Sequence, residues 1–122
     1  MRLLLDTNAL IRWSTGTLKA PGVEAIKRAD IVAVSAITGV EIAIKRQLGK
    51  LRFTGAVEGV AESYGFVEIP VTLRHADRLQ ALPAHHPDPF DRLLIAQALE
   101  EGFTILTSDR AFEPYRVPVV WI

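Results

Sequence analysis

The chain has 122 residues, of which 49% are hydrophobic and 23% are charged, and it contains no cysteine. This composition excludes a disordered chain, a disulfide framework, a thiolate metal site and a cysteine nucleophile. Its 14 basic side chains balance 14 acidic ones, so the net charge favours neither a nucleic-acid-binding protein nor a membrane-surface protein.

One folded domain over residues 1–122 is expected, because the chain has the length of a single domain and shows no repeat, low-complexity tract or long linker. No apolar run approaches the roughly 18 residues that a membrane span needs. The apolar stretch Leu3 to Leu5 stops at Asp6 and does not form a signal segment. We therefore expect a soluble, unexported, cytoplasmic protein.

Short apolar runs alternate with helical patterns along the chain. The expected strands are Arg2–Leu5, Ile31–Val34, Phe66–Ile69, Thr104–Leu106 and Val117–Trp121. The expected helices are Asn8–Trp13, Gly22–Arg28, Ala36–Leu48, Ala56–Tyr64, Thr72–Leu82 and Pro89–Glu101. Most of the strand runs are continuously apolar, which is typical of strands covered on both faces. The pattern predicts an α/β fold with a mostly parallel central sheet and helices on both faces.

Two of these helices have clear start and stop signals. Ser35 is a suitable N-cap for the helix at 36–48, and Gly49 follows its end. For the helix at 89–101, Asp88 is the expected cap, Pro89 suits the first turn and Gly102 ends it.

Four acidic residues, far apart in sequence, fall at one edge of the predicted sheet. Asp6 and Asp109 follow the C-terminal ends of two strands, whereas Glu41 lies in the first two turns of one helix and Asp91 in the first turn of another. Strand C-terminal ends and helix N-termini share one edge of a parallel α/β sheet. Topology alone therefore predicts that these four carboxylates meet.

Each acid also has an ordinary structural interpretation. Glu41 borders the apolar stripe of its helix and is spaced to pair with Lys45 one turn later. Asp91 follows the cap of its helix by three residues, as in a capping box. Asp6 can cap the helix that follows it, and Asp109 can serve as a turn residue.

Several converging carboxylates must either take up protons or bind a cation, because unit charges about 4 Å apart repel by about 4 kcal/mol at an effective dielectric of 20. Oxygen ligands without cysteine favour Mg²⁺, or Mn²⁺ as a substitute, over zinc. Such an ion activates water and stabilises charge on a phosphoryl oxygen. The four acids are thus candidates for both catalysis and metal binding in phosphodiester hydrolysis.

Four segments carry a family resemblance over nearly the whole chain. They are Leu4 to Asn8 (LLDTN), Ser35 to Lys45 (SAITGVEIAIK), Leu82 to Ala98 (LPAHHPDPFDRLLIAQA) and Thr104 to Asp109 (TILTSD). With these segments the chain resembles the PIN-domain family, and most closely the VapC-type ribonuclease toxins of prokaryotic toxin–antitoxin pairs. By this resemblance Asp6, Glu41, Asp91 and Asp109 match the family's Mg²⁺-binding quartet.

The resemblance implies a Mg²⁺-dependent endoribonuclease toxin acting on RNA, within a family range from transfer RNA to ribosomal RNA. It also implies a small antitoxin that covers the active groove and often delivers a basic side chain to the acids, and a toxin homodimer. Two departures from the family pattern leave the acids intact. Asn8 stands where close relatives often have His, and Gly39-Val40 stands where Leu-Trp is frequent.

Other polar and aromatic residues have weaker claims. His85 and His86 can act as metal ligands or general bases, but we predict that they point in different directions in a polar loop leading to the Asp88 cap. Thr7, Asn8, Ser35 and Ser108 are open candidates for orienting the carboxylates. We expect Trp13 and Trp121 to be core or dimer-interface residues rather than base-stacking platforms.

A basic segment follows Glu41. Its four cations, Lys45, Arg46, Lys50 and Arg52, can meet phosphate, although a solvated helix end is the favoured interpretation.

Two other enzyme classes lack their motifs. Asn8 stands where an aspartyl-nucleophile phosphatase needs a second acid, and the chain has no Gly-rich phosphate loop ending in Lys-Ser/Thr. The remaining alternative is a catalytically silent module of the same fold that binds RNA or protein. Four uncompensated acids would repel phosphate, which weighs against RNA binding by such a module.

Overall fold

Five short strands form one sheet in the computed structural model, which describes residues 1–122. They are β1 (Arg2–Leu5), β2 (Ile31–Ser35), β3 (Val67–Ile69), β4 (Thr104–Thr107) and β5 (Val119–Trp121). All neighbouring strands are parallel, in the order β3-β2-β1-β4-β5. The predicted α/β class is confirmed, and the sheet is parallel throughout.

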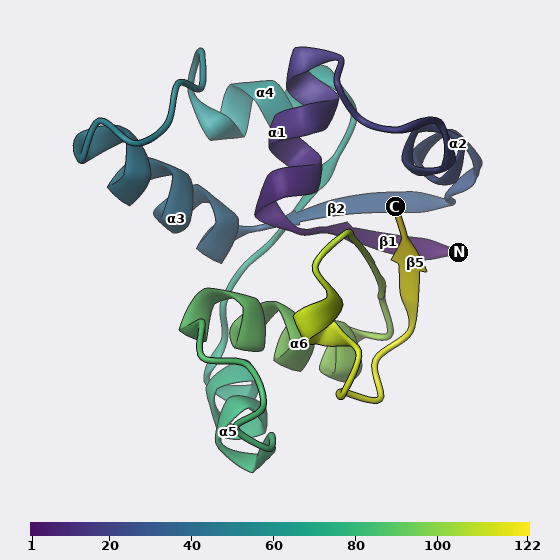
Figure 1. Ribbon diagram of the computed structural model, residues 1–122, viewed down its shortest axis with the longest axis vertical. Coiled ribbons are helices and arrows are strands. Elements are labelled where there is room, and N and C mark those ends of the chain that lie inside the picture. The colour runs from purple at the N-terminus through teal and green to yellow at the C-terminus, as the bar shows by residue number, and fades with distance from the viewer.

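Helices cover both faces of the sheet (Figure 1). They are α1 (Thr7–Thr15), α2 (Ala20–Arg28), α3 (Ala36–Gln47), α4 (Val57–Ser63), α5 (Leu73–Ala81), α6 (Pro89–Glu101) and the short 3-10 helix η1 (Arg110–Phe112). The first four lie on one face, α6 lies on the other, and α5 packs against α6. None of the helices is long and apolar enough to cross a membrane.

Burial on both faces explains the continuous apolar runs. In β1, Leu3 and Leu5 join the core on the α1–α4 side, whereas Leu4 joins the core on the α6 side, and all three side chains are fully buried. Successive strand residues point to opposite faces, so a strand covered on both sides needs apolar residues at every position.

The predicted helix signals are confirmed at α3 and α6. The Ser35 hydroxyl accepts the backbone N–H of Ile37, and the Asp88 carboxylate accepts that of Phe90. Gly49 and Gly102, with φ of 69° and 74°, adopt the left-handed conformation just after the two helices end. These positions favour glycine because a side chain there is strained.

The C-terminal segment differs most from the prediction. β5 begins at Val119 rather than Val117, because its pairing with β4 starts at Ile105 and Pro118 has no N–H to donate. η1 was not predicted. Trp13 and Trp121 both pack against the core, as expected: Trp13 contacts Tyr64 and Phe66, while the guanidinium of Arg110 lies 4.3 Å from the ring centroid of Trp121.

The direction of strand addition reverses at the centre of the sheet. After β1 the chain builds β2 and β3 on one side, and then returns to build β4 and β5 on the other. β1 and β4 are therefore neighbours from which the connections leave in opposite directions. Ligands of open parallel sheets bind outside the strand C-terminal ends at such a reversal.

Candidate active site

Asp6 lies at this reversal of strand order, directly after β1. Its backbone N–H extends the parallel ladder by donating to the Leu106 carbonyl at 3.2 Å. One carboxylate oxygen accepts the N–H of Ala9 at 2.8 Å, and the other accepts the hydroxyl of Thr107. Asp6 is therefore the cap of α1, the alternative considered for it, and is also a buried carboxylate held in one orientation.

Glu41 reaches the same edge from the second turn of α3. Its Oε1 accepts the hydroxyl of Thr7 at 2.7 Å, and its Oε2 lies 2.7 Å from Nζ of Lys45. The salt bridge with Lys45, proposed as the ordinary interpretation, is thus present. The side chain of Glu41 is only 8% exposed, so this carboxylate faces the interior rather than solvent.

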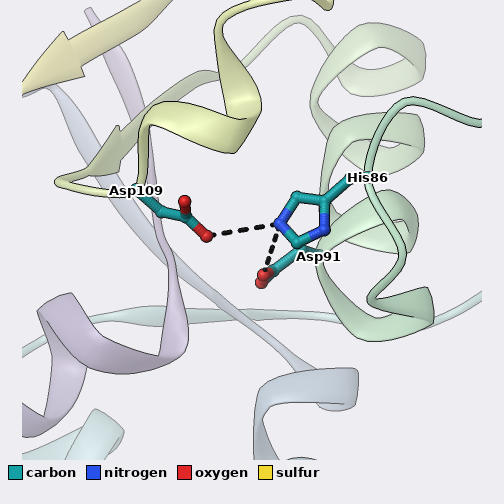
Figure 2. A group of neighbouring side chains, drawn as sticks. All are labelled: His86, Asp91 and Asp109. Carbon is teal, nitrogen blue, oxygen red and sulfur yellow. Dashed lines mark hydrogen bonds and ion pairs between the residues drawn. The ribbon is translucent and has the colours of Figure 1, made fainter.

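Asp91 and Asp109 both approach one nitrogen of the His86 ring (Figure 2). Nε2 of His86 is 3.1 Å from Oδ2 of Asp91 and 3.2 Å from Oδ2 of Asp109. Asp91 extends from the first turn of α6, whereas Asp109 caps η1 by accepting the N–H of Ala111 at 2.9 Å. Ligand atoms of the three residues lie within 4.8 Å of one another.

The carboxylates interact electrostatically. Burial raises the pKa of Asp6 above its usual range despite the hydrogen bonds from Thr107 and Ala9, and the negative charges of Asp109 and Glu41 raise it further. Burial and the charge of Asp88, followed by those of Asp6 and Glu41, raise the pKa of Asp91 to about 7, although His86 opposes the shift. The charge of Asp6 thus interacts with those of Glu41, Asp91 and Asp109.

The raised pKa values of Asp6 and Asp91 reflect burial first, and the negative charges of neighbouring acids add to it. Without a cation such a group of acids retains protons, whereas a divalent ion stabilises all of them in the charged form. Besides Nε2 of His86, the candidate donors are carboxylate oxygens, which are the ligands that Mg²⁺ and Mn²⁺ prefer. The group whose ligand atoms lie close enough to share one cation is His86, Asp91 and Asp109, and its oxygen donors fit a hard divalent ion. Asp6 and Glu41 lie outside that group and act on Asp91 through their charges.

Of the four residues considered for orienting the carboxylates, two make buried side-chain hydrogen bonds and two do not. Thr7 donates to Glu41, and Ser35 donates to the buried amide of Gln97, whereas Asn8 and Ser108 are exposed and make no side-chain hydrogen bond. Thr107, which was not among the predicted site residues, donates to Asp6. The sequence signal for Thr107 was its position between the end of the predicted strand Thr104–Leu106 and the candidate ligand Asp109.

The two histidines point in different directions, as predicted. His85 is exposed and packs its edge on Tyr115, but His86 is buried against the acids rather than being only part of a polar loop. The capping box considered for Asp91 is absent, because the backbone N–H of Asp88 donates to Nδ1 of His86 instead.

The basic segment after Glu41 is divided in the structure. Lys45 faces the acids, while Arg46 donates to the carbonyl of Gly55 at 2.8 Å and lies over the ring of Phe53. Lys50 and Arg52 are exposed beyond the helix end, in agreement with the favoured interpretation of a solvated helix end.

Comparisons with known proteins agree with this architecture. Residues 3–117 match the model of the PIN domain. The chain is 33% identical over 129 residues to Ribonuclease VapC22 of Mycobacterium tuberculosis, with 98% of each chain covered.

Two solved structures have the same fold. One is a toxin–antitoxin complex from Klebsiella pneumoniae, with a TM-score of 0.70, 20% identity, and 97% of this chain and 95% of that chain covered. The other is VapBC2 from Rickettsia felis bound to a promoter DNA fragment, with a TM-score of 0.75, 14% identity, and 100% and 99% covered. Together with the domain match and the full-length relative, they establish that this chain belongs to the PIN-domain family, in the group that includes the VapC-type ribonucleases.

Proposed function

We propose that this protein is a Mg²⁺-dependent endoribonuclease that acts as the toxin of a type II toxin–antitoxin pair. The observation that carries the proposal is the shared electrostatic environment of Asp6, Glu41, Asp91 and Asp109 at the reversal of strand order. The full-length similarity to a protein named as a ribonuclease supports RNA as the substrate.

The four acids would hold a Mg²⁺ ion, for which Mn²⁺ is a possible substitute. When bound, such an ion activates a water for attack on the phosphodiester and stabilises the charge that develops on a phosphoryl oxygen. The chain's own residues orient the ligands: Thr107 and the Ala9 N–H hold Asp6, Thr7 holds Glu41, and His86 lies between Asp91 and Asp109.

Lys45 supplies the positive charge at the mouth of the site. Its ammonium contacts Glu41, and the charges of Asp88 and Asp91 also act on it, while its side chain is 42% exposed. An RNA backbone approaching four carboxylates needs cations to offset repulsion. We assign that role to Lys45 together with the bound ion.

An antitoxin is the proposed protein partner, since structures with this fold include toxin–antitoxin complexes. An open groove of about 480 Å³ lies between α3 and α4. Its apolar residues include Val57, Ala61 and Phe66, and Glu58 and Glu62 also line it. An antitoxin segment with apolar side chains flanked by basic ones would complement this groove.

We also propose the homodimer that is common in the family. A stripe of apolar side chains on the outer face of α3, at Val40, Ile44 and Leu48, is exposed and supports an interface. Sedimentation equilibrium of the purified protein tests it: a mass of twice 13.5 kDa is expected, and a monomer at every concentration would contradict it.

Cleavage of transfer and ribosomal RNA, with Mg²⁺ or with EDTA, tests the activity. The wild-type protein should cleave only with Mg²⁺, and Asp6→Asn should lose cleavage because it removes one ligand charge. Asp77→Asn is the matched control, since Asp77 is exposed on α5 and makes no contact with the site. It should cleave like the wild type.

Two results would contradict the proposal. One is RNA cleavage by the wild type in EDTA that the Asp6→Asn variant retains. The other is RNA binding without turnover that becomes tighter in Asp6→Asn, which is the behaviour of a silent binding module.

A further inference from the structure

His86 is fixed in place by residues from the C-terminal part of the chain. Its backbone N–H donates to Oη of Tyr115 at 2.9 Å, and that hydroxyl donates to the carbonyl of Pro83 at 2.8 Å. Its ring meets Phe112 edge-on, with centroids 5.7 Å apart and an interplanar angle of 89°. The side chain is 7% exposed, so little freedom remains to reorient the ring.

The tautomer of this ring follows from its contact with the start of α6. The backbone N–H of Asp88 donates to Nδ1 of His86 at 3.1 Å. A ring nitrogen that accepts a hydrogen bond uses its lone pair and carries no hydrogen. The hydrogen of the neutral imidazole is therefore on Nε2, the atom that faces the acids.

Nε2 is directed at the two carboxylates from different elements (Figure 2). It lies 3.1 Å from Oδ2 of Asp91 and 3.2 Å from Oδ2 of Asp109. The spacing of these three side chains alone would suit a metal ion bound by one nitrogen and two oxygens. A nitrogen that carries its own hydrogen cannot donate a lone pair to a metal, so the tautomer excludes that arrangement.

We propose that His86 is a positioning residue whose Nε2–H group donates to Asp109 and lies against the carboxylate of Asp91, so that it holds the two aspartates together as oxygen ligands, and that it is not itself a metal ligand. The inference rests on the proposed function, because it takes the two aspartates as ligands of a divalent ion. An all-oxygen ligand set favours Mg²⁺ or Mn²⁺, whereas an imidazole ligand would favour zinc. His86 would thus contribute to the choice of metal while remaining outside the ligand set.

Long-range ¹H–¹⁵N correlation spectra of the imidazole rings test the tautomer in the wild-type protein. The His86 signals are assigned by their loss in His86→Gln. We expect a protonated Nε2 and an unprotonated Nδ1, with the same pattern after Mg²⁺ is added. Loss of the hydrogen from Nε2 on Mg²⁺ addition, or a hydrogen on Nδ1, would overturn the proposal.

Mg²⁺ affinity, measured by calorimetry, tests the positioning role. His86→Phe keeps a ring but removes the donor, and it should weaken Mg²⁺ binding by about 10- to 100-fold, as for other residues that orient metal ligands. His86→Gln retains an N–H donor and should recover most of the affinity. His85→Phe is the matched control and should bind Mg²⁺ like the wild type, since His85 is exposed.

The affinity results separate the possible failures. The positioning role would be contradicted if His86→Phe bound Mg²⁺ as tightly as the wild type does. It would also be contradicted if His86→Gln bound Mg²⁺ no more tightly than His86→Phe. If His86→Phe does not fold, as judged by thermal unfolding, the wild-type spectra decide. Intact Mg²⁺ binding and the expected tautomer without RNA cleavage would count against the proposed ribonuclease and not against the role of His86.

Discussion

The ammonium of Lys45 lies 2.7 Å from Oε2 of Glu41, one turn along α3, and this hydrogen bond raises the pKa of Lys45. The other oxygen of Glu41 accepts the Thr7 hydroxyl. Both oxygens of this buried carboxylate therefore have a donor. A divalent ion that binds Glu41 must approach, and in part replace, the ammonium group.

Replacing Lys45 should therefore tighten metal binding. We expect Lys45→Met to increase Mg²⁺ affinity about two- to tenfold, because repulsion between unit charges about 4 Å apart is about 1 kcal/mol in water. The measurement is calorimetric Mg²⁺ titration at low salt. Lys50→Met, which removes an equal charge from an exposed position beyond α3, should change the affinity little. Weaker Mg²⁺ binding by Lys45→Met would mean that orientation of Glu41 outweighs the repulsion.

Loss of the Thr7 hydroxyl should have the opposite effect and weaken Mg²⁺ binding, because this hydroxyl orients Glu41. Thr7→Val preserves the shape of the side chain but removes the donor to Oε1 of Glu41. We expect Mg²⁺ affinity and RNA cleavage to fall by about 10- to 100-fold. Thr15→Val is the control, because the Thr15 hydroxyl is exposed at the end of α1. Equal effects of the two variants would show that the contact with Glu41 has no special role.

The raised pKa of Asp91 predicts how stability depends on pH without metal. The native state keeps the proton of Asp91 up to about pH 7, whereas an unfolded aspartate loses it near 3.9. The native state therefore binds more protons in that window, so metal-free stability should fall as pH rises from about 4 to about 7. The loss is on the order of 4 kcal/mol.

Thermal unfolding in EDTA at pH 5 and pH 8 measures this loss. Asp91→Asn should reduce the difference between the two pH values, although Asp6, with its pKa also raised, leaves a residual slope. Mg²⁺ should stabilise the wild type more at pH 8 than at pH 5, because binding requires the deprotonated carboxylates. Stability that rises over this window without metal would contradict the assignment of Asp91.

The side chain of Ser35 links the first turn of α3 to the buried side chain of Gln97. Its hydroxyl donates to Oε1 of Gln97, a fully buried side chain, and accepts the N–H of Ile37. Ser35→Ala removes the cap and leaves the Gln97 oxygen unpaired, which should cost about 1 to 3 kcal/mol in the free energy of unfolding. Urea denaturation measures this cost. Ser14→Ala, at a partly buried position on α1, should cost less than half as much.

The sequence predicted most of the fold because its signals are local. β1 and α6 have the predicted bounds. Each of the other predicted strands and helices differs from its prediction by one or two residues at one or both ends. Apolar runs, helix caps and glycine stops act within a few residues of each boundary. η1 was missed because three residues carry no periodic pattern.

The candidate site was predicted in part for the same reason. Asp6, Glu41, Asp91 and Asp109 could be assigned to one edge from strand ends and helix starts alone. Thr7 was a candidate for orienting them, but the contacts of Thr107 and Tyr115 could not be predicted, since they join distant segments. Thr107 reaches Asp6 across 101 positions of sequence, and Tyr115 holds His86 across 29.

By itself, then, the sequence determined a mostly parallel α/β sheet and the assignment of four carboxylates to one of its edges, because hydrophobic periodicity and chain direction decide both. Only the tertiary structure decided the strand order, the burial of His86 and the atom of its ring that faces the acids. Those features depend on packing and hydrogen bonds between segments far apart in the chain, and no local pattern of residues encodes them.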